Sequence, residues 1–124
     1  MKLTENFNLS EFQCKCGCKM PEDVYSNIIK LANNLQALRN HLEQPIKLTN
    51  AYRCQKHNDS IKGSAKNSQH VQGKAADIKV QSMMPIEVKN VIEFLISEGN
   101  MLQGGIGLYN SFLHVDIRKN KARW

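Results

Sequence analysis

The sequence predicts an α+β fold in which a small, mostly antiparallel sheet is flanked by helices. Two stretches have apolar residues at the three- and four-residue steps of a helix, and several shorter stretches have the pattern of strands. The chain has 124 residues, 41% of them hydrophobic and 23% charged, which is typical of one globular domain. We therefore expect a single domain over residues 1–124, with the cysteine-rich residues 1–20 packed onto it.

The first predicted helix begins at Glu22 and ends before Pro45. Pro21 and the acidic pair Glu22 and Asp23 suit the start of a helix, whereas residues 1–20 show no regular pattern. One apolar stripe faces the core and consists of Val24, Ile28, Leu31, Leu35, Leu38 and Leu42.

The middle of the chain alternates between strands, a loop and a second helix. Residues 46–52 and 74–80 have the pattern of short strands. The polar residues 53–69 between them predict a loop with at most one helical turn. The second helix is predicted over residues 85–98, because a proline opens this stretch and a glycine follows it.

The last two predicted strands, residues 105–109 and 112–118, form a hairpin. In the second of them the odd-numbered positions are apolar, which leaves His114 and Asp116 on the opposite face. The same alternation in the strand before the second helix places Asp77 on the face away from the core. If these two strands lie side by side, the three polar side chains meet on that face.

His70, Asp77 and His114 form a candidate zinc site. His70 lies seven residues before Asp77, and Gly73 between them allows a tight turn back toward the strand. Two imidazoles and one carboxylate are the three protein ligands that a catalytic zinc needs, with a fourth position open. A single histidine is more often a surface or hydrogen-bonded residue, so the pattern alone leaves both interpretations open.

Two motifs in these segments resemble the signatures of a known family. Residues 68–77 read SQHVQGKAAD and match S-x-H-x-x-G-x-A-x-D, and residues 114–116 read HVD. Both are signatures of the zinc D-Ala-D-Ala peptidases, a group that includes VanX-type dipeptidases, phage L-alanyl-D-glutamate endolysins and, in fold, the hedgehog signalling domain. Residues 49–54, TNAYRC, resemble the arginine motif of the same family, and residues 104–109, GGIGLY, resemble its small, phage-associated branch.

The resemblance implies a role for each residue of the site. Zinc would be held by His70, Asp77 and His114, and a water molecule activated by the metal would attack a peptide carbonyl. Arg53 would stabilise the substrate carbonyl or the oxyanion that forms from it. Without the resemblance, Arg53 would be interpreted as part of a surface salt bridge.

The general base is less clear from the motifs. Several branches of the family have a carboxylate three residues before the last histidine ligand, where this sequence has Ser111. Asp116 is the substitute that we predict, because strand geometry places it on the same face as His114. The alternative is that Asp116 only supports the site or pairs with Arg118 or Arg123.

Four cysteines, Cys14, Cys16, Cys18 and Cys54, form a second candidate site of a structural kind. A disulfide between Cys14 and Cys16 would close a very small loop with poor geometry. The four thiols therefore predict either a structural zinc ion or one or two disulfides formed in an oxidising compartment, and the sequence does not separate these two interpretations.

The function that we expect is that of a zinc-dependent peptidoglycan peptidase acting on stem peptides or cross-links. The class covers D,D-carboxypeptidases, D,D-endopeptidases and L-Ala-D-Glu endopeptidases, which share these motifs. The alternative is a non-catalytic, zinc-containing module of the same fold that binds the cell wall. A nucleic-acid-binding protein is disfavoured, since aromatic residues make up only 6% of the chain.

Charge and hydropathy suggest where the protein works. The net charge of +6 fits an anionic bacterial cell wall. The first ten residues lack the pattern of a signal peptide, and no apolar run approaches the roughly 20 residues that span a bilayer. We therefore expect a protein that is made in the cytoplasm, does not insert into membranes and acts at the wall after release, as a phage or prophage lysis enzyme does. We also expect a monomer, although no sequence pattern reports the oligomeric state.

Overall fold

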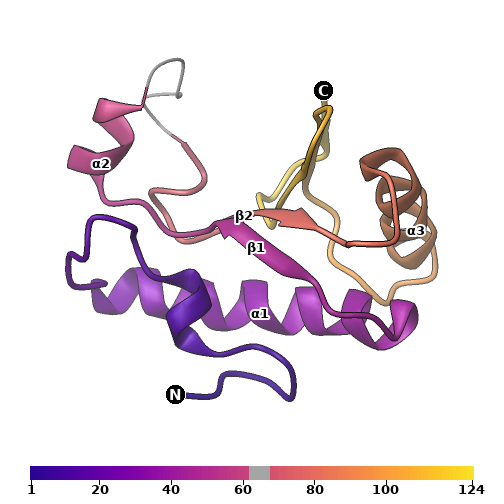
Figure 1. The fold of residues 1–124 in the computed structure, drawn as a ribbon, viewed down its shortest axis with the longest axis horizontal. Helices are drawn as coiled ribbons and strands as arrows, with labels where there is room; N and C mark the ends of the chain where they lie inside the picture. Colours follow the sequence, from indigo (N-terminus) through magenta and orange to yellow (C-terminus); the bar gives the residue numbers. More distant parts are fainter. Residues whose placement is uncertain (62–67) are drawn as a thin grey trace.

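The computed structural model describes residues 1–61 and 68–124, and these form an α+β fold around a five-stranded sheet (Figure 1). The order of the strands across the sheet is β1-β2-β4-β3-β5. The elements are η1 (Leu9–Phe12), α1 (Glu22–Leu42), β1 (Lys47–Asn50), α2 (Gln55–Ser60), β2 (Ala75–Lys79), α3 (Pro85–Ser97), β3 (Gly105–Leu108), β4 (Leu113–Asp116) and β5 (Ala122–Arg123).

The sheet is antiparallel except at one edge, so the predicted fold class is confirmed. β1 pairs with β2, β2 with β4 and β3 with β4, all antiparallel. The edge strand β5 pairs with β3 in parallel and was not predicted. A strand of two residues is too short to show an alternating pattern. β5 is held in the sheet because the N–H of Leu108 donates to the carbonyl of Trp124, and the N–H of Trp124 donates to the carbonyl of Ile106.

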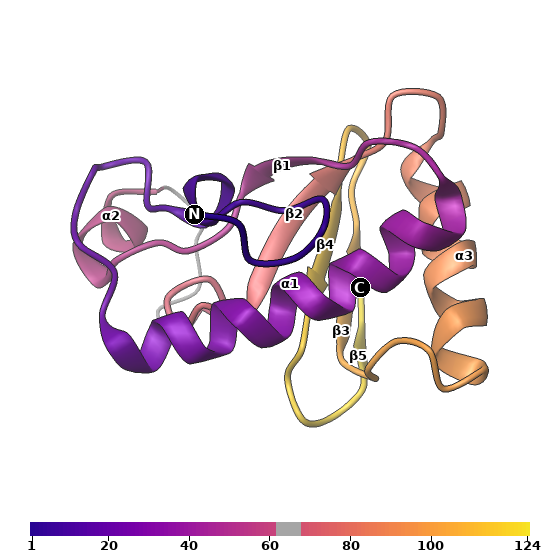
Figure 2. The same ribbon diagram turned by 90° about the horizontal axis from the view of Figure 1, so that it is seen from below.

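Helix α1 supplies much of the core and runs across one face of the sheet (Figures 1 and 2). Its predicted apolar stripe is buried except at Leu42, which is partly buried near the end of the helix. Helix α3 packs against β3 and β4 and touches α1. It ends at Ser97, one residue before the predicted end, and Glu98 follows as its cap.

The first twenty residues are more ordered than the sequence predicted. η1 is a short 3₁₀ helix, closed by a hydrogen bond from the backbone N–H of Asn8 to the carboxylate of Glu11. Phe7 and Phe12 are buried in the same hydrophobic cluster as α1 and the sheet. A 3₁₀ turn of four residues is too short to have a periodic signature, which is why the pattern did not reveal it.

The chain leaves the sheet after β1 earlier than predicted, because its backbone groups find other partners. The N–H of Tyr52 donates to the carbonyl of Phe12, and the N–H of Arg53 donates to the carbonyl of His70. The helical turn expected in residues 53–69 is α2, and residues 62–67 of that loop lie outside the described residues. Within the described part of the chain, no helix is long and apolar enough to cross a membrane.

Candidate active site

His70, Asp77 and His114 come from two neighbouring strands and the turn before one of them. Asp77 on β2 lies directly opposite His114 on β4 in the register of the sheet. His70 lies in the turn that leads into β2, and Gly73 has the positive φ, +73°, that this tight turn was predicted to need. The two strands therefore bring together the three residues that the motifs singled out.

The donor atoms of these three side chains point to one place. Nε2 of His70 lies 3.3 Å from Oδ1 of Asp77, and Nδ1 of His114 lies 3.2 Å from the same oxygen. One ligand atom from each residue lies within 4.8 Å of the other two. Ligands about 2.0–2.1 Å from a tetrahedral zinc ion are about 3.4 Å apart, so the spacing fits that metal.

Hydrogen bonds on the outer edges of both imidazoles direct their inner nitrogens toward the site. Nδ1 of His70 lies 2.7 Å from the carbonyl oxygen of Ala51 and donates a hydrogen bond to it, so in the neutral ring Nε2 has the free lone pair. Nε2 of His114 lies 2.7 Å from Oδ2 of Asp116, so Nδ1 is the nitrogen that faces Asp77. Metal-binding histidines commonly have such a partner on the second nitrogen.

Asp116 lies on the far edge of His114 and is surrounded by donors. Its side chain is completely buried and accepts hydrogen bonds from the guanidinium of Arg118 and from the backbone N–H groups of Gly105 and Arg118. A Cβ at position 105 would overlap the carboxylate, which is why only glycine lets the two strands approach here. These contacts correspond to the alternative in which Asp116 supports the site and pairs with Arg118.

Arg53 is buried with an unpaired donor. Its side chain lies near the carboxylate of Asp77, whose charge acts on it, and among the described residues Nε has no hydrogen-bond acceptor. Burial lowers the pKa of the guanidinium from its usual value, although Asp77 counteracts this. A buried donor without a partner costs free energy, and a ligand oxygen is the kind of group that would satisfy it.

The carboxylates and His114 are shifted toward their charged forms. Burial by itself would raise the pKa of Asp77, but the close contacts with the imidazoles of His114 and His70 lower it well below its usual range. The pKa of Asp116 is lowered in the same way by His114 and Arg118, against the effect of burial. Burial opposes the charged form of His114, and the hydrogen bonds to Asp116 and Asp77 raise its pKa nevertheless.

Sequence reasoning missed how the C-terminal residue covers the site. The indole of Trp124 lies against His114, with ring centroids 4.9 Å apart, and Cζ of Arg118 lies over the indole, 5.1 Å from the ring centroid. Nε1 of Trp124 donates to the hydroxyl of Tyr109 at 2.9 Å. Trp124 lies outside any periodic pattern, so only the pairing of β5 with β3 brings it here.

The other sequence-derived candidates lie elsewhere. Ser111 is exposed in the turn before β4, and Arg123 pairs with Glu93 on α3 rather than with Asp116. The four cysteines form a second group of ligand atoms, also within 4.8 Å of one another and separate from the histidines. A backbone hydrogen bond from His57 lowers the pKa of the Cys54 thiol to about 7.

Comparison with known proteins gives the family of the chain. Residues 4–116 match the family model described as peptidase M15, and the chain therefore belongs to that family. The chain is also 32% identical, over 104 residues, to the probable peptidoglycan L,D-endopeptidase MepK of Haemophilus influenzae. That alignment covers 79% of this chain and 50% of MepK, so the chain spans about half the length of this curated relative.

Proposed function

We propose that the chain is a zinc-dependent peptidase that hydrolyses peptidoglycan stem peptides or their cross-links. The observation that carries this proposal is the convergence of His70, Asp77 and His114, with both imidazoles held by outer hydrogen bonds. Membership of the peptidase M15 family and the activity in the name of MepK support the substrate class. That activity also favours an endopeptidase, which cuts within cross-linked peptides, over a carboxypeptidase.

The three ligands would leave one coordination position for substrate or water. A zinc ion held there supplies the Lewis acidity for attack of water on a peptide carbonyl. Arg53 would donate from its unpaired Nε to the substrate carbonyl as negative charge develops on the oxygen. Its burial makes this donor rigid and poorly screened by solvent, which strengthens an electrostatic contribution.

Asp116 would act as a positioning residue in this scheme. It holds His114 by Nε2 and is itself held by Arg118, so the imidazole presents Nδ1 to the metal. We assign it this role in place of the general-base role expected from the sequence, because its carboxylate faces away from Asp77 across the ring. Trp124, which is exposed and lies beside His114, would offer an apolar wall to the substrate.

Digestion of purified peptidoglycan tests the proposal. Zinc-loaded protein should release soluble fragments, and mass spectrometry of these fragments identifies the bond that is cut. The His114→Ala protein serves as the matched control, since it keeps the fold's strand pairing but lacks one ligand. Release that does not exceed this control would contradict a peptidase activity.

One observation favours a second function, a zinc-containing module that binds the wall without cutting it. Among the described residues, the acidic side chains in contact with the two histidines are Asp77 and Asp116. Asp77 contacts both histidines, and Asp116 is paired with His114 and Arg118, so neither is left to act as a general base. Asp59, the other acidic residue near Arg53 in the chain, accepts a hydrogen bond from Gln55 on α2. Sedimentation of the protein with peptidoglycan, without fragment release, would support this second function.

The expected place in phage lysis is a finer part of the proposal. Its support is the resemblance of residues 104–109 to the small phage-associated branch and the net charge of +6. Protein added to cells with permeabilised membranes should then lyse them, whereas the His114→Ala protein should not.

A further inference from the structure

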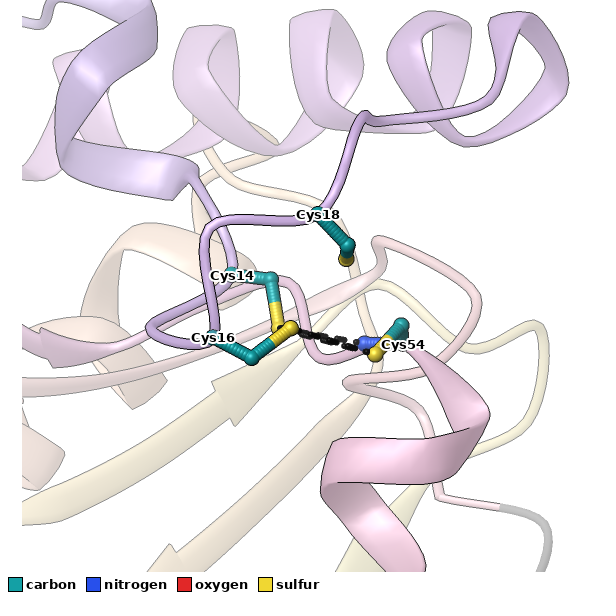
Figure 3. A group of neighbouring side chains, drawn as sticks. All are labelled: Cys14, Cys16, Cys18 and Cys54. Atoms are coloured by element: carbon teal, nitrogen blue, oxygen red, sulfur yellow. Dashed lines mark hydrogen bonds between the residues drawn. The ribbon is translucent and has the colours of Figure 1, made fainter.

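The four cysteine side chains converge on one point although they come from two distant segments (Figure 3). Cys14, Cys16 and Cys18 lie in the loop between η1 and α1, and Cys54 is the residue before α2. Sγ of Cys14 lies 3.2 Å from that of Cys16 and 3.9 Å from that of Cys54, and the sulfurs of Cys16 and Cys54 are 3.4 Å apart. The cluster is separate from the histidine site.

This spacing fits one metal ion. Four thiolates about 2.3 Å from a tetrahedral zinc ion are about 3.8 Å apart, close to the distances between these sulfurs. All four cysteines are free thiols in the structure. Disulfides would divide the cluster into pairs, whereas here three sulfurs are each near the other two and the fourth lies within the same sphere.

Backbone groups and nearby charges support thiolates at this place. The N–H of Cys54 donates to Sγ of Cys14 at 3.4 Å, and the N–H of His57 donates to Sγ of Cys54 at 3.4 Å. Lys56 lines the same hollow as Cys16, Cys18 and Cys54. Such donors and cations stabilise negative charge on sulfur, which four thiolates around a divalent ion would carry in excess.

We propose that the four cysteines bind one structural zinc ion, which joins residues 14–18 to the start of α2. A four-sulfur tetrahedral site is typical of zinc, and a site with four protein ligands has no open position for catalysis. The residues just before these two segments already meet through the backbone hydrogen bond from Tyr52 to Phe12. The zinc ion holds them together beside Arg53, which directly precedes Cys54 in the chain.

Metal analysis of four proteins that contain residues 1–124 tests the proposal. The proteins are prepared with zinc under reducing conditions, and free metal is then removed by gel filtration. We expect two zinc ions per chain in the wild type, one in His114→Ala and one in Cys16→Ser. The exposed Lys15 lies between two of the cysteines, so Lys15→Ser is the matched control and should keep two.

X-ray absorption at the zinc edge identifies the ligands without altering any cysteine. The ion left in the His114→Ala protein should have four sulfur neighbours at about 2.3 Å. Zinc bound only through nitrogen and oxygen, iron in its place, or no metal in this protein would overturn the proposal. So would an intact mass, under non-reducing conditions, that shows the loss of two hydrogens per disulfide.

The outcome is independent of the proposed peptidase activity. If the histidine site binds no metal, the wild type and His114→Ala should both contain one sulfur-bound zinc ion. That result would contradict the proposed function and leave the cysteine site standing. If the cysteine site fails instead, the wild type contains one zinc ion and His114→Ala contains none.

Discussion

The histidine site and the cysteine cluster are held by different parts of the fold. Asp77 and His114 lie on adjacent, hydrogen-bonded strands in the middle of the sheet order, and all three residues of that site are buried. The cysteines lie in a loop and at the start of a six-residue helix, and Cys16 is exposed. The first site offers three candidate ligands to a metal ion and the second offers four.

Because of this difference, the two sites depend on different parts of the structure to hold their side chains in place. Strand pairing and outer hydrogen bonds hold the three candidate ligands of the histidine site in place without a metal, and in the proposed function this leaves one coordination position for chemistry. The loop that carries three of the cysteines lies outside the sheet, and we infer that the ion itself supplies much of its rigidity. Arg53 and Cys54 are neighbours in the chain and connect the two sites.

The largest effect is expected for His114→Ala. Loss of one of three ligands should remove zinc from the histidine site, and release of peptidoglycan fragments should fall to the level of a metal-free control. The cysteine cluster should keep its zinc ion in the same protein. Fragment release close to that of the wild type would show that the histidine site is not the active site.

The next largest effect is expected for Arg53→Ala. Removal of one donor to a developing oxyanion costs about 10²–10³-fold in kcat in comparable sites, and we expect a loss of that order with zinc content unchanged. Arg53→Lys, which keeps the charge and loses the planar fork, should recover only part of this loss. Turnover within a factor of two of the wild type in Arg53→Ala would exclude a catalytic role.

A change in the cysteine cluster should act on stability more than on chemistry. Cys16→Ser should lower the free energy of unfolding by about 3 kcal/mol or more, because a structural metal ion contributes directly to folding. Its loss of turnover should be smaller than that of Arg53→Ala. Denaturant unfolding of Cys16→Ser and Arg53→Ala measures their stabilities, with Lys15→Ser as the control. Equal stability of these three proteins would contradict a structural role for the cysteine cluster.

Asp116→Asn should have a moderate effect that distinguishes a positioning residue from a general base. Loss of the partner of a metal-binding histidine costs about 10–100-fold in metal affinity or activity. Because Asp116 holds Nε2 of His114, we expect zinc affinity and turnover to fall together in competition and digestion assays. Turnover that falls while zinc affinity stays unchanged would restore the general-base interpretation.

The smallest effect, on the free energy of unfolding, is expected for Glu93→Gln, because Glu93 lies outside both sites. Glu93 accepts two hydrogen bonds of 2.8 Å from Arg123, and these hydrogen bonds lower the pKa of its carboxyl from the usual value. Lys121 and Lys89 add a weaker attraction. The pair is partly exposed, so its loss should cost about 0.5–1 kcal/mol at neutral pH, with the zinc content unchanged.

The pH dependence of that effect follows from the lowered pKa. The contribution of Glu93 is present above the pKa of the unfolded chain and disappears as the pH falls through the lower pKa of the folded protein. Unfolding curves of Glu93→Gln and the wild type should therefore converge in acid. A difference that grows as the pH falls would contradict this account.

Strong local patterns made much of the fold predictable. The apolar stripe of α1 and the alternation in β2 and β4 follow directly from the 3.6- and 2-residue periods, so the helices and the central strands were found within a few residues. The same alternation placed Asp77, His114 and Asp116 on one face. It did not show that this face is buried as well, because Trp124 and Arg53 reach it from segments without a period.

The residue types and their order determined which chemistry this chain carries, namely two imidazoles and a carboxylate at the spacing of a known motif and four thiols in two segments. Only the tertiary structure decided what each nitrogen and oxygen faces. Asp116 shares a strand face with His114 in either role, and its place on the Nε2 edge depends on Arg118 and on the close approach of Gly105 from β3. The alternation of side chains along one strand does not say which residues of the neighbouring strand lie beside them. The partners of each side-chain hydrogen bond are therefore set by how the strands pair.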